Sequence, residues 1–376
     1  MSNNPANQSS TDRPSFSLFV QTARPYLKKM APFLIAGALV YFAVHLLMDV
    51  EYAGQDVTVR GPRVFSWARG LVGKPALSAD QQPVRAVQLF AQGTDSIDPR
   101  TITQGAVYDC RFLAELSSFA RTPKGRECIK QMIRQNADGT YTVTFPGPPP
   151  IPITVTPLTA MELKLYGKTP PNNNDIWLPV LEKAYGEYRI THQDALEHVF
   201  RTLKHGIFEW RWTSRPELPG FGASYGAKDD LAAVLLSGHN LRRVPTVGVE
   251  IGEFGLAKGY VNTRQMRSWL NRDAVVAEII GEQERLLKQA HDSDAIITAT
   301  TEVAASEAQG LFSNHAYAIL DYDPEKRELL IRDVMSKCDF VDPATGKVRD
   351  GRADGVFVLN LAEFNKYFSH VNVGEP

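Results

Sequence analysis

The sequence contains few cysteines, and none of them follows a pattern typical of a metal site. Among 376 residues only Cys110, Cys128 and Cys338 are cysteines, and no C-x-x-C pair occurs. Three scattered cysteines allow at most one disulfide, which excludes both a disulfide-framed small module and a cysteine-ligated metal cluster. Whether Cys128 pairs with Cys338 stays open from the sequence. At least one free thiol is expected in either case.

The sequence also lacks an excess of charge of either sign. Lys and Arg number 41 against 42 Asp and Glu, which gives a formal net charge of −1. Nucleic-acid binding needs a clustered basic surface, so we expect no nucleic-acid partner. Hydrophobic residues make up 43% of the chain and charged residues 22%, as in an ordinary folded globular protein.

One long run near the N-terminus has no formally charged side chain. Residues 1–30 form a polar tail that becomes basic toward its end, and we expect this tail to be disordered. The run that follows holds about 18 uncharged residues, enough to cross a bilayer at about 1.5 Å per residue. Because the run is apolar on all faces, we predict a single transmembrane helix over residues 31–49. A cleaved signal peptide fits less well, since no A-x-A-like site follows.

The charges that flank this run predict its orientation. Arg24, Lys28 and Lys29 precede it, whereas acidic residues follow it. The positive-inside rule then places the N-terminus in the cytoplasm and the large domain on the opposite side of the membrane. Residues 50–97 lack sustained periodicity, and we interpret them as a juxtamembrane linker with a short helix near residues 84–90.

The segment QGAVYDCRFLAELSSFA, residues 104–120, is typical of a prepared thiol nucleophile. Cys110 opens an apolar-periodic run with few helix breakers, and Gln104 lies six residues before it. A thiol at a helix N-terminus faces the positive end of the helix dipole, which favours the thiolate. The Gln104 amide and the Cys110 backbone N–H can both donate hydrogen bonds to the oxyanion of an acyl-transfer intermediate. The alternative is a buried helix with an inert cysteine.

A strand pair near the C-terminus is predicted to bring a histidine to an aspartate. Two apolar runs of strand length are joined by D-P-E-K, which suits a turn with proline at its second position. Pairing Tyr322 with Arg327 places His315 opposite Val334, and a register one residue different places it opposite Asp333. In either register the imidazole and the carboxylate lie on neighbouring rungs, within reach of a hydrogen bond.

These elements indicate an α+β protein with a helical N-lobe that carries the cysteine and a β-rich C-lobe that carries His315. Between Cys110 and His315 we predict a broken helical stretch, a β-hairpin, a helix capped by Asp175, a second helix and, in the last range, one or two solvent-faced helices. The predicted ranges are 110–135, 141–155, 175–189, 229–237 and 263–291.

Several segments resemble the calpain family of papain-like cysteine proteases. The Cys110 segment is similar to QG-x-x-GDCWFL, and NDIWLPVLEKAYGEY at 174–188 is similar to the W-x-x-LLEKAYAK helix. SNHAYAILDY at 313–322 resembles the segment with the catalytic histidine, and DGVFVLNLAEFNKYFSHV at 354–371 resembles the end of the protease core. With weaker matches at DGTYTVTF and SDAIITATT, the resemblance covers residues 98–373, which it identifies as a calpain-like catalytic domain.

The resemblance implies a papain-like two-lobed core, preceded by the transmembrane helix, that hydrolyses a protein or peptide substrate. Cys110 would attack as a thiolate, His315 would protonate the leaving amine, Asp333 would orient the imidazole, and Gln104 would help form the oxyanion hole. Asp333 replaces an asparagine of the family, and the tryptophan, proline and glycine around the family site are also replaced. A transglutaminase-like acyltransferase and a pseudoprotease scaffold that binds peptides therefore stay open as alternatives.

Calcium is where the chain departs furthest from the family pattern. Calpain cores hold Ca²⁺ through carboxylates of both lobes, and such cations need several oxygen ligands. Thr101 stands where the family has an aspartate, and Val356 stands two positions after Asp354 where another acidic residue is expected, although Glu182 is retained. No EF-hand loop is present. We expect no activation by calcium, no metal site and no cofactor; because the family ligands are only partly retained, calcium is the one cofactor that stays open.

Overall fold

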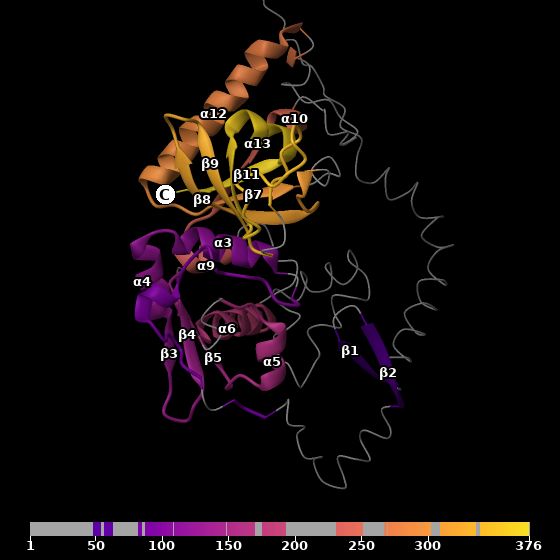
Figure 1. The fold of residues 1–376 in the computed structure, drawn as a ribbon. Coiled ribbons are helices and arrows are strands. Elements are labelled where there is room, and N and C mark those ends of the chain that lie inside the picture. The colour runs from indigo at the N-terminus through magenta and orange to yellow at the C-terminus, as the bar shows by residue number, and fades with distance from the viewer. Residues whose placement is uncertain are drawn as a thin grey trace, which may run out of the picture. The chain divides into compact units, whose positions relative to one another are not determined.

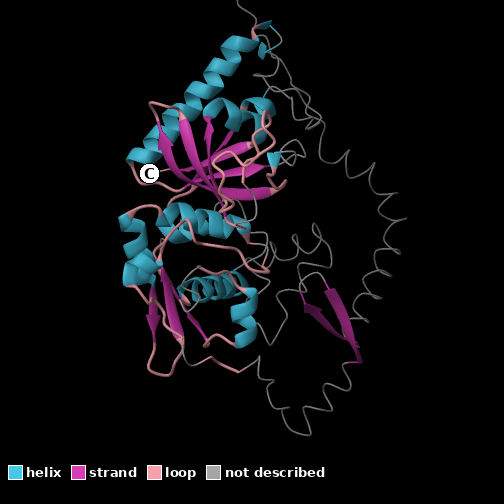
Figure 2. Cartoon of the chain, viewed as in Figure 1, coloured by secondary structure: helices cyan, strands magenta, loops and turns pink. Residues whose placement is uncertain are grey.

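The computed structural model shows two compact units, residues 1–76 and 77–376. In the first unit, strands β1 (Met48–Ala53) and β2 (Asp56–Pro62) form an antiparallel pair. The second unit contains the other helices and strands (Figures 1 and 2). The residues that the structure describes are 48–53, 56–62, 82–84, 87–107, 109–147, 149–169, 175–192, 231–250, 267–268, 270–301, 309–335 and 339–375.

The first part of the second unit, described residues 82–237, is here called the N-lobe. It combines helices with a three-stranded antiparallel sheet of order β3-β4-β5. Its elements are η2 (Gly93–Ser96), α3 (Cys110–Ala120), α4 (Pro123–Met132), β3 (Ile133–Gln135), β4 (Tyr141–Phe145), β5 (Ile151–Val155), α5 (Ala160–Leu165), α6 (Trp177–His192) and α9 (Leu231–Ser237).

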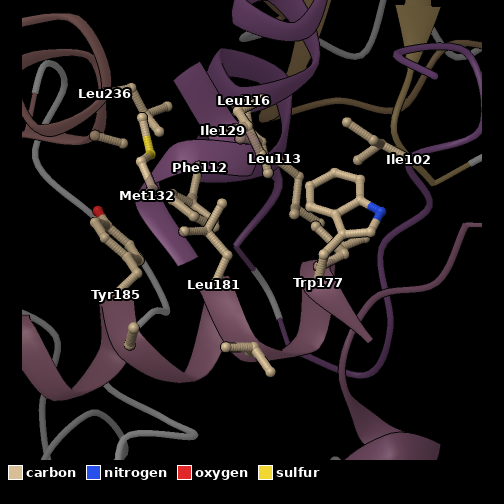
Figure 3. Close-up of a cluster of buried hydrophobic side chains, with 14 of the residues drawn as sticks. Ile102, Phe112, Leu113, Leu116, Ile129, Met132, Trp177, Leu181, Tyr185 and Leu236 are labelled. Carbon is tan, nitrogen blue, oxygen red and sulfur yellow. The ribbon is translucent and has the colours of Figure 1, made fainter. Parts of the chain in front are cut away.

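Helix α3 lies where the N-lobe meets the C-lobe, and apolar residues surround most of it. Figure 3 shows Phe112, Leu113 and Leu116 of α3 facing side chains of α4 and α6. Phe112 is fully buried and stacks on Tyr185 of α6, with ring centroids 4.2 Å apart. Burial of an aromatic side chain of this size contributes about 2–3 kcal/mol, so this packing holds the helix firmly. The first residue of that helix, Cys110, is thereby given a defined position.

The C-lobe, described residues 241–375, is built on a six-stranded antiparallel sheet of order β10-β9-β8-β7-β11-β6. The long helix α12 packs on one face of this sheet (Figure 1). The strands are β6 (Leu241–Pro245), β7 (Ile297–Thr301), β8 (His315–Asp323), β9 (Glu328–Asp333), β10 (Val356–Asn360) and β11 (His370–Gly374), and the helices are α10 (Val247–Glu250), α12 (Arg272–Asp292) and α13 (Leu361–Tyr367).

Strand β8 contributes to both hydrophobic cores, because its side chains alternate between the two faces of the sheet. Ala316, Ala318 and Leu320 belong to the same buried cluster as helix α3. Tyr317 and Ile319 point into the other cluster, which includes α12. One strand therefore joins the two lobes, and the helix that begins with the cysteine lies against the strand that begins with the histidine.

The mixed α+β class is confirmed, and the expected elements between Cys110 and His315 are present with shifted ends. The hairpin at 141–155 is β4 and β5, the helices expected at 175–189 and 229–237 are α6 and α9, and the helical stretch expected at 263–291 contains α12. Asp175 does not cap α6 as predicted, because its carboxylate accepts a hydrogen bond from the Ala91 backbone N–H at 2.6 Å. The stretch predicted as one broken helix ends earlier, since residues 133–135 pair with β4 as strand β3.

Two predictions for the segment before the N-lobe need comment. The short helix near residues 84–90 is wrong, since the described residues there form isolated bridges, Pro83 with Thr159 and Gln88 with Asp175. Residues 50–62, predicted as linker, lie largely in β1 and β2. Residues 31–47 lie outside the described part of the chain, and residues 48 and 49 begin β1. Within the described ranges no helix is long and apolar enough to cross a membrane.

The turn between β8 and β9 differs by one position from the prediction. Asp323, rather than Tyr322, closes β8 and pairs with Glu328. Arg327 has φ of 59°, a left-handed conformation that a strand cannot continue, so it belongs to the turn. The Asp323 carboxylate accepts hydrogen bonds from two backbone N–H groups of the turn, at 2.9 and 3.0 Å. This side chain therefore sets where the turn begins, and both predicted registers are wrong.

Candidate active site

Cys110 is the first residue of α3 and is half-buried. Asp109, the residue before it, occupies the N-cap position but makes no capping hydrogen bond with its side chain. The positive end of the helix is therefore left facing the thiol, which favours a negative charge there. Cys128 is also a free thiol, while Cys338 and Tyr108 lie outside the described residues.

His315 begins β8 and is held by Asp333, the last residue of β9. A bulge in β8 sets Asp333 opposite Tyr317, so His315 reaches the carboxylate diagonally, two residues along the same face. The imidazole Nε2 lies 2.8 Å from Asp333 Oδ1, and both side chains are buried. The same oxygen accepts the Met335 backbone N–H at 2.9 Å. Asn314, with φ of 50°, turns the chain sharply into the strand just before the histidine.

Two aromatic rings, not identified from the sequence, enclose the imidazole. Tyr317 and Phe312 meet His315 edge-on, with ring centroids 4.8 and 5.8 Å away. The Tyr317 hydroxyl accepts the Phe312 backbone N–H at 2.9 Å, which fixes the orientation of the Tyr317 ring. The fully buried Val334 follows Asp333. Tyr317 could have been found from the sequence, because it lies two residues after the histidine and therefore on the same face of the strand.

The second imidazole nitrogen is engaged by the thiol. Since Nε2 of His315 contacts Asp333, Nδ1 is the nitrogen available for the hydrogen bond between His315 and Cys110. Burial alone would lower the pKa of His315, but the hydrogen bonds to Asp333 and Cys110 outweigh it and raise the pKa to about 9. Burial would likewise raise the pKa of Cys110, yet the hydrogen bond and charge of His315 hold it below its usual value. Both shifts favour the thiolate and imidazolium forms of the pair.

Gln104 lies on a loop that contacts both lobes. Its backbone N–H donates to the Val334 carbonyl of the C-lobe at 2.7 Å. Its side-chain Nε2 donates to the Val107 carbonyl at 2.6 Å, which orients the amide group. An amide nitrogen carries two protons, so this hydrogen bond leaves a second one for a ligand. The structure thus connects Cys110, His315 and Asp333 in one chain of contacts and ties Gln104 to the residue after Asp333.

The residues compared with the calcium ligands of calpains make ordinary protein contacts. The Thr101 hydroxyl donates to the Asp98 carbonyl at 3.0 Å, and the Asp354 carboxylate accepts the Val356 backbone N–H at 3.0 Å. Glu182 Oε2 accepts the Gly167 backbone N–H at 2.7 Å. Throughout the described residues, no group of three or more His, Cys, Asp or Glu side chains could hold a metal ion.

Glu182 instead faces Asp109, directly before the cysteine, and the sequence had no sign of this contact. Both side chains are almost fully buried, and a hydrogen bond connects them. Two carboxylates can share a hydrogen bond only if one of them is protonated. Burial raises the pKa of Glu182 well above its usual value, and the charge of Asp109 raises it further. Burial also raises the pKa of Asp109, to about 7, although the hydrogen bond from Glu182 opposes this.

None of the protein-family models matches this chain, and neither does any curated protein. Function must therefore be inferred from the geometry around Cys110, His315 and Asp333 and from the motifs that resemble calpains.

Proposed function

We propose that the protein is a membrane-anchored, calpain-like cysteine endopeptidase with a papain-like two-lobed core. The main support is the continuous chain of contacts from Cys110 through His315 to Asp333, with the thiolate and imidazolium forms both favoured. The cysteine begins a helix of one lobe and the histidine begins a strand of the other, as expected for such a core. Residues 31–49 would be the anchor, with the N-terminus cytoplasmic and the catalytic domain across the membrane.

Each proposed step follows from a group already described. The Cys110 thiolate attacks the peptide carbonyl carbon and forms a C–S bond, and the Gln104 amide and the Cys110 N–H stabilise the oxyanion. His315 gives its Nδ1 proton to the leaving amine as the C–N bond breaks, which leaves a thioester. The neutral His315 then takes a proton from water, which attacks the thioester and releases the acid, and the thiolate and imidazolium re-form.

Asp333 keeps the imidazolium oriented through Nε2 throughout these steps. A carboxylate stabilises the imidazolium more than a neutral amide does, in agreement with the raised pKa of His315. This carboxylate also favours the second candidate, an acyltransferase of transglutaminase type, in which an amine instead of water attacks the thioester.

Labelling of cysteines with a peptidyl electrophile tests the proposal. We expect the full chain to react at Cys110 and to hydrolyse a denatured protein, and Cys110→Ser to lose both properties. His315→Ala should lower the labelling rate at pH 6 by about 100-fold, because the thiolate loses its partner. Cys128→Ser is the matched control, since burial raises the pKa of Cys128 and this thiol should be unreactive.

Three outcomes would decide against the endopeptidase. Labelling at Cys128 instead of Cys110 would place the site elsewhere. Labelling at Cys110 with transfer to an added amine, but without peptide release, would indicate the acyltransferase. Labelling at Cys110 with neither reaction would indicate a peptide-binding scaffold.

A further inference from the structure

A buried arginine connects the two lobes beside the candidate active site. Arg332 lies on β9, one residue before Asp333, and is 1% exposed. Its Nη2 donates to the Ile102 carbonyl of the N-lobe at 3.0 Å and lies 3.4 Å from the Thr103 hydroxyl. Its Nη1 donates to the Asp354 carbonyl of the C-lobe. One guanidinium thus joins backbone atoms of both lobes.

The loop that Arg332 contacts is the loop that ends at Gln104. On one side of Thr103 the guanidinium holds the Ile102 carbonyl, and on the other side the Gln104 N–H donates to the Val334 carbonyl at 2.7 Å. Thr103 itself exchanges two backbone hydrogen bonds with Lys168, at 2.8 and 2.9 Å. The loop is therefore held from both lobes immediately before the side chain that would bind the oxyanion.

Three consecutive residues, Arg332 and Asp333 at the end of β9 and Val334 directly after it, hold two parts of the site at once. Asp333 orients His315, while Arg332 and Val334 on either side of it contact the Gln104 loop. A shift of β9 relative to the loop would change the distance from Gln104 to the cysteine–histidine pair. Oxyanion stabilisation depends steeply on the position of the donor, so this geometry matters for rate.

We propose that Arg332 is a positioning residue for the oxyanion hole, acting through the Gln104 loop; this rests on the proposed protease function. A planar guanidinium suits the role because it directs several N–H donors at acceptors in different directions, whereas lysine offers a single point charge. Its charge is constant over the physiological pH range, so this link between the two lobes does not depend on pH there.

Hydrogen exchange in the full chain tests the connection without relying on activity. Arg332→Lys should raise the exchange rate of the Gln104 backbone N–H, which donates to the Val334 carbonyl, by about tenfold or more. The reference is the exchange rate of the backbone N–H groups in the middle of α3. Arg121→Lys is the matched control. Arg121 follows α3 and also joins the lobes, donating to the Ala290 and Asp294 carbonyls at 3.2 and 3.4 Å. Its other described side-chain hydrogen bond goes to the Ser118 carbonyl and not to residues 102–104. Unchanged protection of Gln104 in Arg332→Lys would overturn the proposal.

Two reagents distinguish an effect of the substitution on the oxyanion hole from an effect on the thiolate. A peptide aldehyde forms a tetrahedral adduct that uses the oxyanion hole, whereas alkylation by iodoacetamide requires only the thiolate. In Arg332→Lys we expect aldehyde affinity and kcat to fall about 10- to 100-fold, while the alkylation rate of Cys110 stays within about threefold. A parallel fall in alkylation would show that Arg332 acts on the ion pair and not on the oxyanion hole.

A double-mutant cycle with Gln104→Ala completes the test. If Arg332 acts through Gln104, Arg332→Lys should lower kcat by less than about threefold once the amide is already absent. Additive losses would overturn the proposal. A parent protein that neither hydrolyses peptides nor reacts at Cys110 would instead refute the protease function, and the exchange of the Gln104 amide would still decide whether Arg332 holds the loop.

Discussion

Replacing Glu182 by glutamine should stabilise the protein, and by more at neutral than at acidic pH. Glu182 is fully buried, accepts the Gly167 N–H at 2.7 Å and shares a hydrogen bond with Asp109. That bond requires a proton, which burial and the Asp109 charge keep on Glu182. In the unfolded chain the same carboxyl has an ordinary pKa of 4.5 and is ionised at pH 7. Folding at pH 7 therefore includes the cost of protonating it.

The size of this effect follows from the pH and from the unfolded pKa. Each pH unit above the unfolded pKa of 4.5 adds about 1.36 kcal/mol to the cost of keeping Glu182 protonated in the folded protein. This cost is therefore about 3 kcal/mol at pH 7 and about 1 kcal/mol at pH 5.5. The pKa of Glu182 is higher in the folded than in the unfolded chain, so the folded state binds more protons. The free energy of unfolding therefore falls as pH rises above the unfolded pKa of this carboxyl. Glutamine is neutral in both states, and its amide can accept from Gly167 and donate to Asp109. The gain for Glu182→Gln should thus approach these two figures.

Urea unfolding of the full chain at both pH values measures the gain, provided that the slope of free energy against urea is unchanged. Glu162→Gln is the contrasting control. Glu162 forms a buried ion pair with Lys183 at 2.8 Å, so its replacement leaves a buried charge unpaired and should destabilise by about 3–5 kcal/mol. A loss of stability in Glu182→Gln at both pH values, or a gain that does not grow with pH, would show that Glu182 is ionised in the folded protein.

Three further expectations concern activity. Cys110 should already be alkylated rapidly at neutral pH, because His315 keeps its proton up to about pH 9 and favours the thiolate; reactivity that is lost at neutral pH and appears only near the ordinary thiol pKa of 9.0 would refute the ion pair. Asp333→Ala should lower turnover strongly, whereas Asp333→Asn should retain more activity. In Asp333→Asn, His315 should lose its proton at a lower pH than in the parent, as a pH profile of kcat/KM would show. Equal activity of Asp333→Ala and the parent would exclude Asp333 from the mechanism. Because Thr101 and Val356 stand where acidic ligands are expected, hydrolysis by the full chain should be equal in chelator and in millimolar Ca²⁺, and a tenfold rise with Ca²⁺ would contradict this.

Patterns within short segments were enough to predict several elements. Alternating apolar residues at 141–155 predicted β4 and β5, and apolar spacing after Cys110 predicted α3 with the cysteine at its first residue. The contact between His315 and Asp333 could also be anticipated, because a short turn between two strands brings their far ends together. These signals depend on neighbours in the chain, and a single sequence contains them in full.

Only the tertiary structure decided the register of β8 and β9, the pairing of Glu182 with Asp109 and the contacts of Arg332. The register depends on a bulge and on the left-handed conformation of Arg327, neither of which has a sequence signature here. Arg332 and Ile102 are 230 positions apart, and the acceptor is a backbone carbonyl, a group that every residue has. The sequence can therefore indicate which residues bring chemistry to the site. It cannot indicate which buried backbone atoms and carboxyl groups will hold them in place, because those partners meet only when the two lobes pack.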